Sequence, residues 1–269
     1  MTRYQAGRAD VRVPVGLAIP SVAGLALLLL PLVGLAARVP WSRLWQILSS
    51  PDVLNALRLS LTTAAITTVV CLACGVPIAW LLARSELAGR SLVRGLVTVP
   101  LVLPPVIGGV ALLVTFGRRG LLGEWLYETF GISLPFTTAA VVMAQSFVAM
   151  PFLVVAVEGA LRTADRRFED VAATLGASEW TTFRRVTLPA VAPGVFAGAV
   201  LCWARALGEF GATVTFAGSY PGTTRTMPVA AYAAINSGDV ETAIVLSLLM
   251  ITVSVAVLVS LRDRWVRTG

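Results

Sequence analysis

The 269-residue sequence contains no histidine and no lysine, and charged residues make up only 13% of it. Without histidine, the chain lacks the commonest metal ligand and the usual general base at neutral pH. A typical soluble domain has about 25% charged residues, whereas 57% of this chain is hydrophobic. The composition therefore excludes an ordinary soluble domain and favours an integral membrane protein.

Cysteine is also scarce, with three residues that all lie inside apolar stretches. Cys71 and Cys74 form a C-x-x-C pair, but no βαβ pattern surrounds them, as a thioredoxin-like redox motif would require. We therefore expect Cys71, Cys74 and Cys202 to be small packing residues.

Six apolar segments are long enough to cross about 30 Å of hydrocarbon, which takes about 20 helical residues. They cover residues 15–37, 59–83, 95–116, 136–157, 190–217 and 240–261. The first is longer than the apolar core of a signal peptide, so we expect it to remain as a span. The sequence predicts an all-α integral membrane protein with six transmembrane helices, forming a single transmembrane domain over residues 1–269.

Arginine supplies all of the positive charge, and the net charge is +7. Fourteen arginines lie in the termini and in alternate connections, at positions 3, 8, 12, 84, 90, 94, 162, 166, 167, 184, 185, 262, 264 and 267. Six lie in the opposite connections, at positions 38, 43, 58, 118, 119 and 225. Positive charge concentrates on the cytoplasmic side of membrane proteins, so we expect both termini to be cytoplasmic. Arginines placed beside apolar spans indicate topology, and no nucleic-acid partner is expected.

A polar, charged stretch separates the fourth span from the fifth, on the expected cytoplasmic side. Asp165 can cap a helix there, and Glu169 and Asp170 would lie near the positive N-terminal end of that helix. We predict a short helix over residues 165–181.

The same stretch contains features that suit a contact with another protein. Ala172 and Ala173 favour a helix and let a partner backbone approach closely. Gly176 permits a sharp end to the helix. Leu188 and Pro189 are expected to begin the next span, where the missing N–H of proline costs nothing.

Together these residues resemble the EAA signature of ABC-importer permeases, in which a glutamate, paired alanines, a glycine and a trailing Leu–Pro follow one another. The resemblance implies a cytoplasmic coupling helix that docks on a separate ATP-hydrolysing subunit. The residues it assigns to coupling are Glu169, Asp170, Ala172, Ala173, Gly176, Leu188 and Pro189.

Three further stretches, at 100–109, 205–216 and 221–232, are similar to the permease subunits of molybdate and sulfate ABC importers. The third is similar to molybdate permeases in particular, although Thr223 replaces an acidic residue often found there. The resemblance implies a type I ABC importer permease fold, a homodimer in the bacterial inner membrane, and two ATP-binding subunits. It also implies an extracytoplasmic binding protein that delivers molybdate, with tungstate or sulfate as alternative substrates.

No nucleotide-binding motif is present. The glycines between Gly117 and Gly123 lack the G-K-[ST] of a P-loop. We therefore expect ATP and magnesium on the partner subunit, and no enzymatic activity, cofactor or metal on this chain.

Arg205 and Glu209 are four residues apart in an apolar segment, so they can pair on one helical face. Arg205 could attract an anion into the pathway, or it could lock helices together with Glu209. Nearby hydroxyl and backbone groups could donate to a passing oxyanion, although small residues can equally serve close helix packing. The candidate pathway residues are Arg205, Gly208, Glu209, Gly211, Thr213 and Thr215.

Two other functional classes are weighed against a permease. A secondary transporter driven by an ion gradient often has internal repeats and several intramembrane acids, whereas Glu209 is the one convincing acid at depth here. A membrane enzyme would need a nucleophile and base or a metal cluster, and the sequence assembles neither.

Overall fold

The computed structural model describes residues 15–85 and 88–266, and this part of the chain is helical without strands. Arg3, Arg8, Arg12 and Arg267, which entered the prediction of sidedness, lie outside the described residues. The first half of the chain contains α1 (Val15–Ala37), α2 (Leu44–Leu48), α3 (Pro51–Arg84), α4 (Arg90–Val102), α5 (Pro105–Phe116) and α6 (Gly123–Phe130). The second half contains α7 (Thr138–Thr163), α8 (Arg167–Thr174), α9 (Glu179–Thr182), the π-helical segment η1 (Phe183–Thr187), α10 (Leu188–Leu207), α11 (Gly211–Phe216), α12 (Met227–Asn236) and α13 (Val240–Val266).

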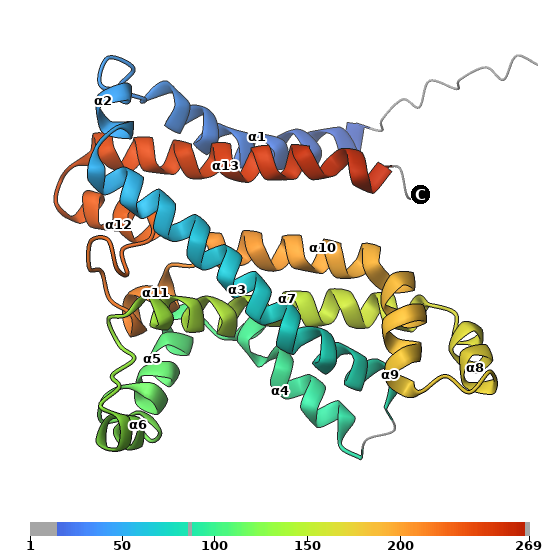
Figure 1. Ribbon diagram of the computed structural model, residues 1–269. Coiled ribbons are helices and arrows are strands. Elements are labelled where there is room, and N and C mark those ends of the chain that lie inside the picture. The colour runs from blue at the N-terminus through green and yellow to red at the C-terminus, as the bar shows by residue number, and fades with distance from the viewer. Residues whose placement is uncertain (1–14, 86–87, 267–269) are drawn as a thin grey trace, which may run out of the picture.

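Among the described residues, five helices are long and apolar enough to cross a membrane, and α4 with α5 brings the number to as many as six. This confirms the predicted all-α membrane architecture. Figure 1 shows α2, α6 and α12 at one end of the bundle and α8 and α9 at the other. The short elements between spans therefore alternate between two ends, as six crossings require.

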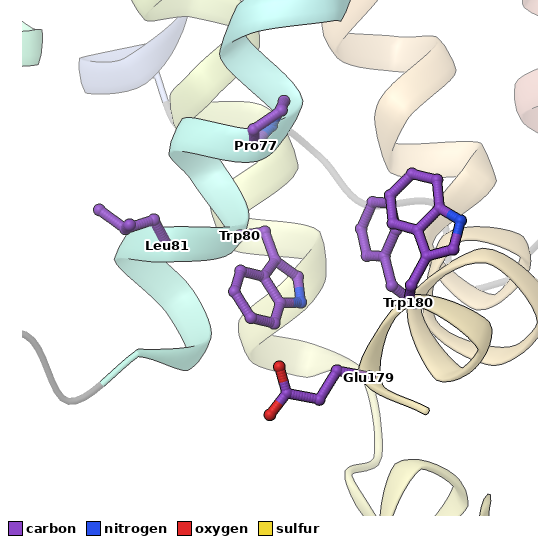
Figure 2. Close-up of a pocket in the computed structure, with 6 residues that line it drawn as sticks. Pro77, Trp80, Leu81, Glu179 and Trp180 are labelled. Atoms are coloured by element: carbon purple, nitrogen blue, oxygen red, sulfur yellow. The ribbon is translucent and has the colours of Figure 1, made fainter. Parts of the chain in front are cut away.

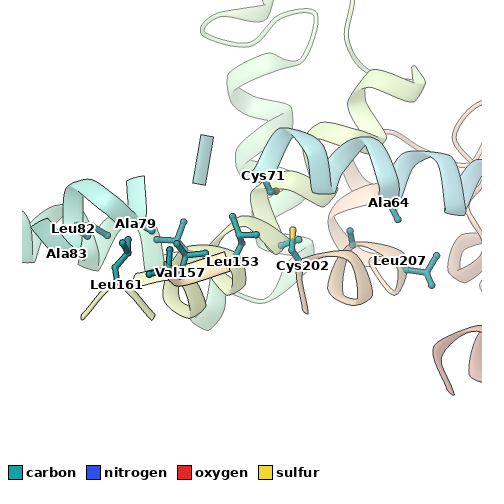
Figure 3. Close-up of a cluster of buried hydrophobic side chains, with 14 residues drawn as sticks. Ala64, Cys71, Ala79, Leu82, Ala83, Leu153, Val157, Leu161, Cys202 and Leu207 are labelled. Atoms are coloured by element: carbon teal, nitrogen blue, oxygen red, sulfur yellow. The ribbon is translucent and has the colours of Figure 1, made fainter. Parts of the chain in front are cut away.

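Helices α3, α7 and α10 form the centre of the bundle, because small buried residues let their backbones approach. Their shared core includes Ala79 and Leu153, which are fully buried (Figure 3). Cys71 of α3 and Cys202 of α10 also belong to this core. They are packing residues as expected, whereas Cys74 is exposed.

The predicted third span, 95–116, is not one straight helix. Helix α4 ends at Val102, α5 begins at Pro105, and the two axes differ by 116°. Leu103 has extended backbone angles, as expected for a residue that precedes a proline. Pro104 and Pro105 also lack the N–H groups that would continue the α4 ladder.

The predicted fifth span, 190–217, is displaced toward the N-terminus. Leu188 and Pro189 begin α10 as predicted, but α9 and η1 precede them without a break, so that a continuous helical run extends from Glu179 to Leu207. Within η1 the hydrogen bonds are one residue longer, as when Leu188 N–H donates to Phe183 O. The helix then stops at Gly208, and α11 follows as a separate short helix.

Helix α13 lies along α1 and is fastened to the α2 region at its N-terminal end (Figure 1). Arg43 and Glu241 form an exposed ion pair of 2.6 Å. Asp239 precedes α13 and accepts a hydrogen bond from Thr242 N–H at 3.1 Å. Hydrogen bonds from the Thr242 hydroxyl and backbone, and then the charge of Arg43, hold the pKa of Asp239 below its ordinary value.

Candidate functional site

The polar stretch after α7 forms two short helices rather than the single helix predicted over 165–181. Helix α8 ends in a Schellman motif, in which Gly176 has a φ of 80° and Ala177 N–H donates to Ala172 O at 3.0 Å. Glycine adopts this left-handed conformation without the strain other residues incur. Helix α9 then starts afresh, because the Ser178 hydroxyl accepts from Thr181 N–H.

Helix α8 is fixed to the body of the protein by its charged residues. Glu169 pairs with Arg84 at the end of α3 at 3.0 Å and accepts from the Thr187 hydroxyl at 3.0 Å. Arg166, just before α8, donates to Ala83 O at 3.1 Å. The Arg84 side chain is only 6% exposed. Glu169 therefore faces the protein and positions α8, rather than pointing outward.

The opposite side of α8 is apolar and uncovered. Phe168, Val171 and Leu175 are 65%, 56% and 81% exposed. Their i, i+3, i+7 spacing places them on one helical face. Asp170 and Ala173 are exposed beside this face, and Ala172 is half-buried. An exposed apolar cluster on a short polar segment indicates a contact surface for another molecule.

The three apolar residues of this face were not among those the sequence resemblance selected. Their helical spacing could have identified them, but an eight-residue helix is too short for such a pattern to stand out. We call Phe168, Val171 and Leu175 the α8 apolar face.

An aromatic pocket of about 410 Å³ lies next to α9, between it and the end of α3 (Figure 2). The Trp180 ring stacks on Phe183 at a centroid distance of 5.8 Å, and Trp80 meets the edge of Phe183 at 6.3 Å. Glu179 also lines this pocket. Trp180 of α9 is an exposed aromatic side chain in the same polar stretch. In the described part of the chain, no group of three or more cysteine, aspartate or glutamate residues is placed to hold a metal ion.

Arg205 and Glu209 form the ion pair that their spacing predicts, at 2.6 Å. The Glu209 side chain is 1% exposed and that of Arg205 25%. The second carboxylate oxygen of Glu209 accepts from Ala212 N–H at 2.8 Å. The pair thus joins the last turn of α10 to the start of α11, across the break at Gly208.

The remaining pathway candidates lie at a tight contact between α11 and α5. A Cβ on Gly211 would come within 2.9 Å of Pro105, and one on Gly109 within 2.7 Å of Thr215. The Thr215 hydroxyl donates to Gly211 O at 2.8 Å. Gly211 and Thr215 therefore serve close packing in this structure.

Gly208 and Thr213 differ from these packing residues. Gly208 is exposed at the break between α10 and α11. Thr213 is fully buried, and its hydroxyl has no hydrogen-bond partner. All six candidates thus lie at or close to the break between α10 and α11, and among the described residues the buried Thr213 hydroxyl finds no partner.

Residues 75–268 match the family described as "Binding-protein-dependent transport system inner membrane component". The molybdenum transport system permease protein ModB of Mycobacterium tuberculosis (strain ATCC 25618 / H37Rv) is 51% identical over 248 residues, covering 91% of this chain and 92% of that protein. The sulfate transport system permease protein CysT of Escherichia coli (strain K12) is 31% identical over 90% of this chain and 88% of its own length.

Among solved structures, a bacterial ABC transporter involved in the import of the acidic polysaccharide alginate aligns with a TM-score of 0.76. The alignment covers 94% of both chains at 15% sequence identity. At this identity the likeness shows a common fold and nothing further.

Proposed function

The chain belongs to the family of binding-protein-dependent transport system inner membrane components, and from this premise we propose that it carries molybdate across the membrane. It is a multi-pass permease subunit of an ABC importer, and ATP hydrolysis belongs to a separate subunit. The observation that carries the choice of substrate is the 51% identity to a molybdenum permease over 91% of the chain, compared with 31% to a sulfate permease.

We further propose that the α8 apolar face is the docking surface for the ATP-binding subunit. Gly176, Asp170, Ala172 and Ala173 would lie at or near this contact. Glu169 would contribute indirectly by fixing α8 to α3, and Leu188 and Pro189 would begin α10 directly after the docked segment. Because ATP is cytoplasmic, this assignment places both termini in the cytoplasm.

The proposed assembly is a homodimer of this subunit with two ATP-binding subunits and an extracytoplasmic binding protein. Within each copy, Arg205 and Glu209 would lock α10 to α11, since the carboxylate neutralises the charge that an anion would meet. The Gly208 backbone and the Thr213 hydroxyl would offer weak hydrogen-bonding groups to an oxyanion, with Gly211 and Thr215 shaping the same region.

Uptake into vesicles containing the complete transporter tests the substrate. With binding protein outside and ATP inside, we expect molybdate uptake that vanadate inhibits and that unlabelled molybdate reduces more strongly than sulfate. Uptake that needs an ion gradient and no ATP-binding subunit would contradict the proposal. Stronger competition by sulfate would instead assign the protein to sulfate transport.

A matched pair of variants tests the docking surface. Val171→Asp adds a charge to the α8 apolar face, so the ATP-binding subunit is expected to dissociate on purification. Thr174→Asp adds the same charge to the neighbouring polar face of the same helix, and the complex is expected to persist. Equal retention of the subunit by both variants would remove the apolar face from the interface.

A further inference from the structure

A second buried carboxylate, Glu158 of α7, lies in a cluster that joins three elements near the end of the bundle where α8 lies. Arg94, in the second turn of α4, donates through Nε to both Glu158 oxygens, at 3.0 and 3.3 Å, and its Nη2 also contacts Glu158. The same Nη2 donates to Leu82 O of α3 at 3.4 Å. The Glu158 side chain is only 9% exposed. Arg94 therefore holds the start of α4 to both α7 and α3.

The last turn of α3 is the common fastening point for α4 and α8. Leu82 O receives Arg94 of α4, Ala83 O receives Arg166 beside α8, and Arg84 pairs with Glu169 within α8. A displacement of α8 would thus act on Ala83 and Arg84, which directly follow the residue that holds the start of α4, Leu82.

The far end of α4 leads to the pathway region. None of the described residues of α4 is fully buried, although Val93 and Val97 pack against the central core, so the attachments at its ends add to a limited apolar contact in positioning this helix. Beyond the bend of 116°, α5 packs against α11 through Gly109, whose Cβ would lie 2.9 Å from Ala212 Cα. Ala212 is also the residue whose N–H is held by Glu209.

We propose that Arg94 is a positioning residue that transmits the movement of α8 to α4, α5 and α11. Its guanidinium suits this role, because a planar fork that binds a carboxylate with several hydrogen bonds fixes direction as well as distance. The inference rests on the proposed function, in that it assumes ATP-driven movement at α8.

The chain provides a matched control on the same carboxylate. Arg162 also pairs with Glu158, through Nη2 at 2.9 Å and Nε at 3.0 Å. However, Arg162 and Glu158 both belong to α7 and are four residues apart, so this pair joins no two elements. If Glu158 needs only a neutralising charge, loss of Arg94 or of Arg162 should have similar effects. If Arg94 transmits movement, only its loss should disturb coupling.

The test compares Arg94→Gln with Arg162→Gln in the complete transporter, measuring molybdate transported per ATP hydrolysed. We expect Arg94→Gln to assemble and hydrolyse ATP while this ratio falls by about twofold to thirtyfold, the range for residues that carry coupling between sites. We expect Arg162→Gln to keep the wild-type ratio. A merely structural role for Arg94 would lower assembly, hydrolysis and transport together and leave the ratio unchanged.

A conservative pair covers the case in which Arg94→Gln does not assemble. Arg94→Lys keeps the charge but loses the planar fork, and its ratio is expected to fall, whereas that of Arg162→Lys should not. An unchanged ratio in the Arg94 variants, or an equal fall in both series, would overturn the inference. Failure of the wild-type complex to take up molybdate with ATP would overturn the proposed function instead.

Discussion

We expect the loss of Arg205 to destabilise the protein more than the loss of its ion-pair partner, Glu209. The Glu209 side chain is 1% exposed and that of Arg205 25%. Arg205→Met would leave a nearly buried carboxylate without its counter-ion, which costs about 3–5 kcal/mol when a buried pair is broken. Glu209→Gln would leave a guanidinium that water can reach in part, and the glutamine oxygen can still accept from Ala212 N–H. We expect a cost of about 1–3 kcal/mol for that variant.

The double variant Arg205→Met with Glu209→Gln removes both charges at once. No isolated charge remains, so we expect it to be more stable than Arg205→Met alone and to show clear non-additivity. For a domain of about this size, 1 kcal/mol corresponds to a change of roughly 2–4 °C in melting temperature. Thermal unfolding of the purified variants in one detergent should therefore give the order wild type, Glu209→Gln, Arg205→Met, with the double variant above the last.

Uptake by the same variants separates a lock from an anion-attracting role. If the pair is a lock, the double variant should transport better than Arg205→Met. If Arg205 attracts the oxyanion, the double variant should transport no better than Arg205→Met. A Glu209→Gln variant less stable than Arg205→Met, or strictly additive costs, would refute the burial argument.

Three further outcomes are expected. Gly176→Ala forces an alanine into the left-handed region at about 1–2 kcal/mol and should lower transport per ATP, whereas Gly159→Ala, at an open helical site, should not. Gly109→Ala should overpack the contact between α5 and α11 by about 1–3 kcal/mol and reduce uptake, whereas a Cβ at Gly95 would meet no atom within 4 Å, so Gly95→Ala should leave uptake unchanged. Because the pKa of Asp239 is lowered in the folded protein, its contribution is complete above about pH 4 and disappears as pH falls further. Below that pH, the melting temperature of Asp239→Asn should therefore fall less than that of wild type. The difference should be no larger than the effect of one exposed helix cap.

Local patterns predicted the parts of the protein that depend on local interactions. Hydropathy located the spanning segments, although not the break in the third or the start of the fifth, and i, i+4 spacing predicted the Arg205–Glu209 pair. Gly176 indicated a helix end, although the predicted helix over 165–181 ran past it. Each of these features is decided within a few residues of chain, where backbone geometry and solvation leave few alternatives.

The parts that the sequence did not predict depend on distant partners. Glu158 finds Arg94 64 positions away, and Glu169 finds Arg84 85 positions away, so no short window contains either pair. The prolines at 104 and 105 permit a break, but the 116° angle also reflects what packs on each half. Likewise, Glu169 matched a contact signature, and only its burial against Arg84 shows that it faces inward.

The π-helical turn at Phe183–Thr187 sets the rotational phase of everything that follows it along α10. Each residue of an α-helix turns the chain by about 100°, and the wide π turn accommodates one extra residue, so winding the same residues as a regular α-helix would swing the far end of α10 by roughly a quarter turn. Arg205 would then face a different neighbour, although no atom near it had been altered. The wide turn is thus what keeps Arg205 facing its present neighbour, about five helical turns away from it.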